Sequence, residues 1–313
     1  MPANTSLKPV AVLILGAAMI IPLAACGNAA ESGSDGAPTD DTAELTGYDV
    51  SGVEKDDAIA ALLPESVTKD GKLTVGMDTS YAPAEFLAED GKTPIGYDVD
   101  LVKALANVFG LEADPQTANF DTIIPSVGSK YDIGVSSFTV TPERLDAVDF
   151  VTFYKAGSTW VTRDGNPDGV DTSDLCGVKV AVQTGTSQEE AISEMNEQCK
   201  ADGKKEIDVL SSKLQTDVTT NVVTGKAAVF YADSPVAGYA VSQTDGELQT
   251  LGSDEGVTKE GAVVKKGDTA TDQALQQAFQ KLIDDGTYMK ILKYWGVESG
   301  AVDMAEINPT DLN

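Results

Sequence analysis

The chain has 313 residues, a formal net charge of −28 and no histidine. So large an acidic excess argues against nucleic acid and against anionic lipid surfaces as partners. Without histidine, no mechanism can use an imidazole base, a Ser-His pair or a histidine-ligated metal, which removes most hydrolase chemistry. We expect neither a metal ion nor a cofactor.

An export signal is predicted at residues 1–25. Its apolar run, from Val10 to Ala25, is shorter than the about 20 residues that a membrane-spanning helix needs. The run leads into Leu-Ala-Ala-Cys-Gly at residues 23–27, which resembles the lipobox of bacterial lipoprotein signal peptides, where the cysteine is acylated and the bond before it is cut. We therefore predict a lipid anchor on Cys26 and a location on the outer face of the cell membrane. A plain signal peptide that happens to end in a cysteine is the alternative.

Residues 26–46 have the composition of a flexible tether. Beyond Cys26 they are rich in Gly, Ala, Ser, Asp and Thr and offer almost nothing that could join a core. The residues that follow are enough for one large domain or for two lobes of ordinary size.

With Cys26 assigned to lipid, Cys176 and Cys199 remain as an even pair in an oxidising compartment. We predict that they form a disulfide, which contributes about 3 kcal/mol by chain-entropy arguments. Two buried free thiols are the alternative.

Hydrophobic spacing predicts alternating strands and helices in the first half of the folded part. A short amphipathic helix over 53–63 is followed by a strand over 72–77, which enters a loop. Apolar residues from 101 to 109 predict a helix that Gly110 stops, a second helix begins near 123–125, and a strand follows at 131–135. This βαβ order predicts a parallel sheet.

The second half repeats the rhythm. A strand over 178–182 runs into a turn of glycine and hydroxyl residues, and a helix follows over 189–197. Such a turn can receive an anionic or carbonyl group on helix N-terminal amides, although most such turns are only caps. A strand over 227–231 delivers Asp233 near its carboxyl end, where open α/β sheets bind ligands. Packing helices are expected over 274–283 and 288–295.

The run Ser-Ser-Phe-Thr-Val-Thr-Pro-Glu-Arg at residues 136–144 resembles the solute-binding proteins of ABC importers, polar amino acid family. Four further motifs of that family occur in order: a strand with Asp-x-x-Tyr at 73–81, Gly-Tyr-Asp-Val-Asp-Leu at 96–101, Gly-Thr-x-Gln at 185–188, and a late strand that ends in Asp233. Each motif is weak alone, but five in order are specific. They place the resemblance at about residues 69–296.

The resemblance implies an α/β fold of the type II periplasmic-binding-protein kind, with two lobes and a ligand cleft between them. The chain would cross between the lobes through two hinge strands, near residues 154–157 and 258–262. Lobe 1 would comprise residues 47–155 and 260–313, and lobe 2 residues 156–259.

In this family the arginine of the 136–144 motif clasps the α-carboxylate of an amino acid, which would be the role of Arg144. The chain has only two arginines, so a casual surface charge is an unsatisfying explanation. A planar guanidinium grips a carboxylate with two parallel hydrogen bonds, whereas lysine acts as a point charge. Ser137 and Thr139 would complete the grip. A helix-terminal salt bridge to Glu143 or Asp146 is the alternative role.

Asp233 matches the family residue whose carboxylate accepts the α-ammonium group, so a zwitterion would bridge both lobes and favour their closure. A turn residue before Ser234-Pro235 is the alternative reading of Asp233. Thr186 and Ser187 would support the carboxylate from lobe 2.

Tyr81 and Phe120 match positions whose rings sandwich the ligand in a mostly apolar pocket. Isolated aromatic residues are more often part of the core. Asp78 falls where related proteins touch a distal amine or amide, which slightly favours basic or amide side chains; an acid here also caps the following turn.

The resemblance thus implies an extracytoplasmic binding component that delivers a polar amino acid to an ABC permease and its ATPase. We expect a monomer without enzymatic activity. Two alternatives stay open: a ligand-sensing partner of a membrane receptor, and an enzyme like cyclohexadienyl dehydratase, whose base would have to be a carboxylate such as Glu85 or Asp78.

Overall fold

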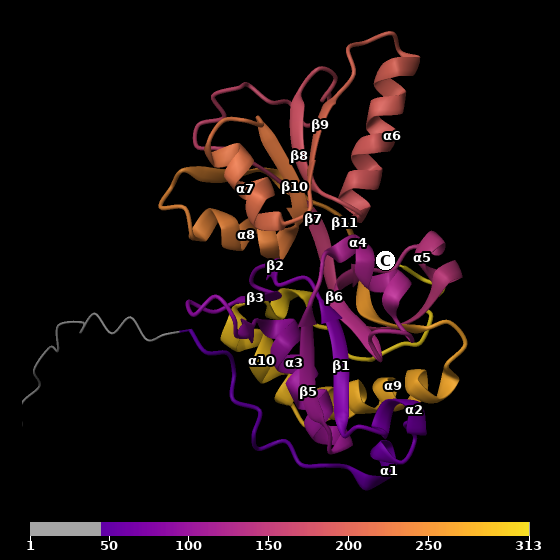
Figure 1. Cartoon of the computed structure of the whole chain (residues 1–313). Coiled ribbons are helices and arrows are strands. Elements are labelled where there is room, and N and C mark those ends of the chain that lie inside the picture. Colours follow the sequence, from indigo (N-terminus) through magenta and orange to yellow (C-terminus); the bar gives the residue numbers. More distant parts are fainter. Residues whose placement is uncertain (1–44, 313) are drawn as a thin grey trace, which may run out of the picture. The chain divides into compact units, whose positions relative to one another are not determined.

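The computed structural model describes residues 45–312 (Figure 1). The predicted signal peptide, Cys26 with its predicted lipid anchor, and the predicted tether up to residue 44 lie outside the described residues. Between residues 45 and 312 no helix is both long enough and apolar enough to cross a bilayer.

The fold is built on one eight-stranded sheet with the strand order β5-β1-β6-β11-β7-β10-β8-β9. Its strands are β1 (Lys72–Met77), β5 (Glu112–Thr117), β6 (Ile133–Thr139), β7 (Val148–Arg163), β8 (Lys179–Gln183), β9 (Asp208–Ser212), β10 (Val229–Asp233) and β11 (Leu248–Lys265). A second, small sheet consists of β2 (Ser80–Tyr81), β3 (Glu85–Leu87) and β4 (Pro94–Ile95).

The prediction of a parallel sheet is correct only for the outer strands. β1 pairs in parallel with β5 and β6, and β8 pairs in parallel with β9 and β10. The two longest strands, β7 and β11, are antiparallel to each other and to their outer neighbours β10 and β6. β7 and β11 run in opposite directions because the chain leaves the first half of the sheet through β7 and returns through β11 (Figure 1).

Helices cover the sheet. They are α1 (Asp57–Ala60), α2 (Glu65–Thr68), α3 (Tyr97–Phe109), α4 (Phe120–Ile123), α5 (Pro142–Ala147), α6 (Ser187–Ala201), α7 (Gln215–Val223), α8 (Ser234–Ser242), α9 (Thr269–Asp284) and α10 (Thr287–Trp295), with short 3₁₀ turns at Ile124–Ser126 and Glu298–Gly300. The helix predicted over 53–63 is mostly wrong. It shrinks to the single turn of α1, because the Asp56 carboxylate caps the backbone N–H groups of Ala58 and Ile59 and so starts the helix late.

The architecture is the two-lobed, type II α/β fold that the sequence predicts. We propose the lobe bounds 47–155 with 260–313, and 156–259; both crossings then fall inside β7 and β11. The pairing of these two strands shifts register between Leu251 and Glu255, between Glu255 and Thr258, and between Glu260 and Gly261. Such irregularities bend and twist a strand pair locally, which suits a hinge.

The second lobe has its own apolar cluster, which includes Trp160 stacked on Tyr231 at a centroid distance of 3.9 Å. The predicted disulfide between Cys176 and Cys199 is present and borders this cluster, with the two Cα atoms 5.7 Å apart. It ties the end of α6 to the segment before β8.

Candidate functional site

A small cavity lies where the carboxyl ends of β6 and β10 meet the first turns of α4, α5 and α6. Its volume is about 10 Å³, which is room for about one water molecule. The cavity is lined by Tyr81, Phe120, Ser137, Thr139, Arg144, Thr186, Ser187, Gln188 and Asp233. All of these except Gln188 are binding residues predicted from the sequence, so eight side chains from distant segments gather at one point.

Arg144 reaches across from α5 to the start of α6. Thr141 caps α5 and accepts the backbone N–H of Arg144 at 3.2 Å. The guanidinium donates through Nη1 to the carbonyl oxygen of Thr139 at 2.9 Å and through Nη2 to that of Gly185 at 3.1 Å. The Phe120 ring lies 5.4 Å from its Cζ. Burial lowers the pKa of Arg144 from its ordinary value, and nearby Asp233 opposes that shift.

Asp233 faces the same cavity from the end of β10. Its Oδ2 accepts the Tyr81 hydroxyl at 2.7 Å, and its Oδ1 accepts Nε2 of Gln188 at 2.7 Å. The Asp233 backbone N–H in turn donates to the Tyr81 oxygen at 3.2 Å. Burial raises the pKa of Asp233 to about 6, against the lowering effect of the Tyr81 and Gln188 hydrogen bonds and the Arg144 charge.

Ser137 and Thr139 lie at the end of β6. Ser137 has a left-handed backbone with φ of 44°, an uncommon conformation for a residue with a side chain. Asp98 stabilises it by accepting the Ser137 N–H at 2.9 Å and its hydroxyl at 3.3 Å. Thr139 Oγ1 lies 3.2 Å from Ser187 Oγ, so this pair joins β6 to α6.

Two buried carboxyl groups, Glu85 and Asp98, support the end of β6. The sequence suggested Glu85 only as the base of the alternative enzyme and did not single out Asp98. Glu85 accepts the Ser136 hydroxyl at 2.5 Å, and Ser136 accepts the backbone N–H of Asp78 at 3.0 Å. Burial raises the pKa of Asp98 to about 7, and burial together with Asp98 raises the pKa of Glu85 well above its usual range. A proton shared by Glu85 and Asp98 avoids two adjacent buried charges.

The first turn of α6 supplies the lobe 2 wall. Thr186 is its N-cap, accepting the N–H of Glu189 at 3.2 Å and donating to the Gln183 carbonyl at 2.8 Å. Gln188, missing from the predicted set, donates to both Asp233 and Ser158. The Gly-Thr-x-Gln motif contained the signal for it.

Asp78 does not line the cavity, unlike the other predicted binding residues. It is 1% exposed, and its Oδ1 accepts the N–H and hydroxyl of Ser80 at 3.0 and 2.7 Å. Its Oδ2 accepts the Phe120 N–H at 3.0 Å and Nε2 of Gln183 at 2.8 Å. The turn-capping alternative describes these local contacts, and Gln183 holds Asp78 from lobe 2.

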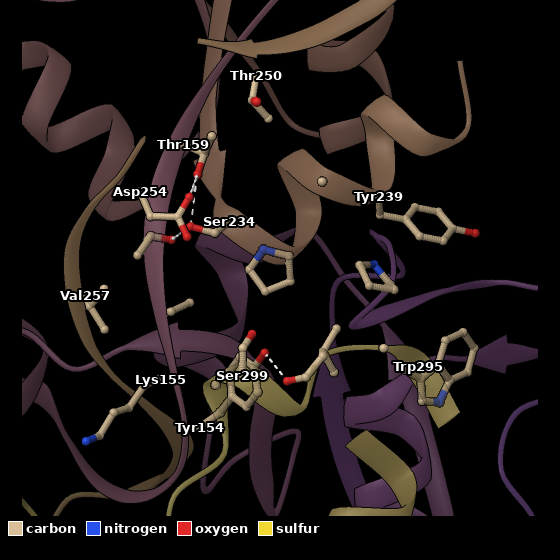
Figure 2. A pocket seen from close by; sticks show the side chains of 18 of the residues that line it. Tyr154, Lys155, Thr159, Ser234, Tyr239, Thr250, Asp254, Val257, Trp295 and Ser299 are labelled. Atoms are coloured by element: carbon tan, nitrogen blue, oxygen red, sulfur yellow. Dashed lines mark hydrogen bonds between the residues drawn. The ribbon is translucent and has the colours of Figure 1, made fainter. Parts of the chain in front are cut away.

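A larger groove of about 610 Å³ lies beside the hinge and contains none of the predicted binding residues (Figure 2). The Thr159 hydroxyl donates to Asp254 Oδ1 at 2.6 Å on one side of it, and Tyr239 and Trp295 lie on the other. The lining of this groove includes Lys155 and Asp254 but no arginine. Among residues 45–312 no group of three or more His, Cys, Asp or Glu side chains has a metal-binding arrangement.

Several known proteins resemble this chain. The arginine-binding protein ArgT of Corynebacterium glutamicum is 37% identical over 257 residues, covering 82% of this chain and 84% of that protein. The crystal structure of the ancestral amino acid-binding protein AncCDT-1, a precursor of cyclohexadienyl dehydratase, matches with a TM-score of 0.67 and 31% identity, over 75% of this chain and 99% of that one. An ancestral arginine-binding protein bound to arginine matches with a TM-score of 0.66 and 30% identity, over 72% and 98%.

The sequence profile of the bacterial extracellular solute-binding proteins, family 3, matches residues 73–298. That span holds both long crossing strands and every residue that lines the cavity. The chain therefore belongs to the bacterial extracellular solute-binding proteins of family 3.

Proposed function

We propose that this protein is the binding component of an ABC importer and that it takes up a cationic amino acid, with L-arginine as the first candidate. The observation that carries the proposal is the facing pair at the cavity. Arg144 in lobe 1 is suited to an α-carboxylate, and Asp233 in lobe 2 is suited to an α-ammonium. A zwitterion between them contacts both lobes, so its binding favours the closed arrangement.

The charge of the interior supports a cationic ligand. Five buried carboxyl groups surround or underlie the cavity, at Asp78, Glu85, Asp98, Asp233 and Glu260. Arg144 is the one cation that lines the cavity. Burial raises the pKa of all five groups, so their ionised forms are costly. A ligand with a positive side chain stabilises those ionised forms, whereas an acidic ligand opposes them. The name of the Corynebacterium glutamicum relative supports the same choice.

The cavity of about 10 Å³ is much smaller than an amino acid, so the ligand must enter by parting the lobes. The Tyr81–Asp233 and Gln183–Asp78 hydrogen bonds join the proposed lobes and would separate first. Once Gln183 is withdrawn, Asp78 becomes available to the distal end of a ligand side chain. This is how Asp78 retains its proposed role as a distal contact.

Delivery to a permease and its ATPase completes the proposal. Acylation of Cys26 would hold the protein at the outer face of the cell membrane, and the tether would keep it near the permease at high effective concentration. If a Cys26→Ser variant stays processed and membrane-bound, the anchor is assigned to the wrong residue. A sensor partner or an enzyme is the alternative, and the AncCDT-1 likeness is the observation that favours the enzyme.

A thermal-shift screen tests the function. Ligand that binds only the folded state raises the melting temperature, by an amount that grows with its concentration over its dissociation constant. We expect L-arginine to give the largest shift among the twenty amino acids, with lysine next. Turnover of prephenate would instead support the enzyme, and a screen in which no amino acid shifts the melting temperature would remove the proposal.

A further inference from the structure

Glu260 is a buried acid of the hinge that no predicted role accounts for. In the sheet it pairs with Thr139 of β6 on one side and with Tyr154 of β7 on the other. Residues paired across antiparallel strands project from the same face of the sheet. Because Thr139 lines the small cavity, Glu260 projects toward the cavity side. The preceding residue, Lys259, projects from the opposite face and pairs with Glu306 at 2.5 Å.

One oxygen of the Glu260 carboxyl group is buried without a hydrogen-bond partner in the described part of the chain. The residue is 1% exposed, and its Oε2 has no hydrogen-bond partner among residues 45–312. The pairing with β7 shifts register directly after Glu260, so Phe153 is the extra residue of a bulge. Bulges re-aim side chains near functional sites. Leaving a buried acceptor unsatisfied is costly, which points to a donor that binds from outside the chain.

The charges around Glu260 indicate what that donor is. The Glu260 carboxyl group is repelled by the like charges of Asp233 and Asp98 and attracted by the opposite charge of Arg144. It also interacts electrostatically with the hydroxyl groups of Tyr81, Tyr97 and Tyr154. Burial first, then Asp233 and Asp98, raise the pKa of Glu260 well above its usual range. A cation between Glu260 and Asp233 turns this repulsion into attraction for both carboxyl groups.

We infer that Glu260 binds the α-ammonium group of the ligand together with Asp233, and so acts as a further recognition residue of the site. The inference rests on the proposed function. An ammonium group has three N–H donors and needs three acceptors. Both Asp233 oxygens already accept one bond each, from Tyr81 and Gln188. Asp233 is thus expected to supply one of the three acceptors. Thr139 Oγ1 and the unpaired Oε2 of Glu260, which face the same side of the sheet, supply the other two.

The same neighbouring charges indicate which part of the ligand Glu260 contacts. The charges that act on Glu260 are Asp233, Asp98 and Arg144. Two of them, Arg144 and Asp233, are the groups proposed to hold the α-substituents, whereas Asp78 at the distal end is not among the three. Glu260 therefore distinguishes an amino acid from the corresponding carboxylic acid that lacks the amino group. It does not distinguish one side chain from another.

A ligand–mutant cycle tests this. Binding of L-arginine and of δ-guanidinovaleric acid, which is arginine without its α-amino group, is measured by titration calorimetry for the wild type and for Glu260→Gln. We expect the substitution to weaken L-arginine about tenfold, as befits the loss of a charged acceptor, and to change the analogue less than twofold. Glu255→Gln on the same strand changes the net charge equally away from the cavity and should alter neither affinity.

Several outcomes would overturn the inference. Unchanged L-arginine affinity in Glu260→Gln would do so, and so would an equal weakening of both compounds, which marks a structural role. Glu260→Leu provides a second variant if the amide folds poorly, with melting temperatures recorded for each protein; it should weaken L-arginine at least as much. If the wild type itself binds no amino acid, it is the proposed function that fails.

Discussion

Asp98 performs a structural task that affects the site. It accepts both the N–H and the hydroxyl of Ser137, whose left-handed backbone lines the cavity. The carboxyl group is fully buried and belongs to a pair with Glu85. The acidic pair thus supports the end of β6 that lines the cavity.

A pH dependence of stability follows from Asp98. Its pKa is raised by burial from 3.8 to about 7, so between about pH 4 and pH 7 the unfolded chain is ionised there while the native protein holds the proton. The stabilisation from this group is present at low pH and lost as pH rises through that window. We expect Asp98→Asn to flatten the decline of melting temperature across pH 4 to 7, measured by calorimetry.

Asp164→Asn serves as the matched control for that profile, because Asp164 is exposed and the change in net charge is the same. The assignment to Asp98 is wrong if the melting temperatures of the two variants fall with equal slope between pH 4 and pH 7.

At the level of residues, the sequence predicts the cavity-lining side chains better than their supports. Arg144, Asp233 and the two motifs rich in serine and threonine could be found because each sits in a short local pattern. Glu260 could not, because it lies within a regular strand and only the tertiary fold turns it toward the cavity. Asp98 lies in the motif at 96–101, but that motif alone did not indicate that its carboxyl group holds Ser137. Asp78 lies in a family motif, yet its oxygens accept hydrogen bonds from Ser80, Phe120 and Gln183 and do not line the cavity.

At the level of elements, strands β1, β6, β8 and β10 and helices α3, α6, α9 and α10 were predictable from the sequence pattern, whereas the edge strands β5 and β9 were not predicted. The long strands β7 and β11 were not predictable from that pattern either. The middle of β11 carries Gly252, Ser253, Asp254, Glu255 and Gly256, a composition typical of a loop. Of this stretch only Glu255 pairs with β7, and the register shifts on both sides of it. The proposed hinge is therefore where the local sequence least resembles a regular strand.

The disulfide is the element-scale feature with the clearest energetic consequence. Cys176 and Cys199 are 23 residues apart, so the bond removes loop-closure entropy from the unfolded chain. We expect the double substitution of both cysteines by serine to lower the free energy of unfolding by about 3 kcal/mol, measured by denaturant titration. Ligand affinity should persist, because the bond lies at the far end of α6 from Thr186. An unchanged unfolding midpoint would argue against this account.

At the level of the whole molecule, direct contacts between the two proposed lobes hold the cleft shut. Tyr81 bonds to Asp233, Thr139 to Ser187, Arg144 to the Gly185 carbonyl, and Lys213 forms an ion pair with Asp121. Each contact is a modest polar interaction. We therefore expect closure to be an equilibrium that a ligand with matching charges shifts.

The central claim is that Arg144 and Asp233 clamp an amino acid by its two α-substituents across the cleft. Calorimetric titration with L-arginine and with agmatine, which is arginine without its carboxylate, tests this most directly. We predict that the wild type binds L-arginine at least about 100-fold more tightly than agmatine, since two charged hydrogen bonds to Arg144 are lost. Arg144→Ala should abolish this preference, whereas Arg163→Ala should keep it. Equal affinity for the two compounds in the wild type, or a preference that survives Arg144→Ala, would contradict the account.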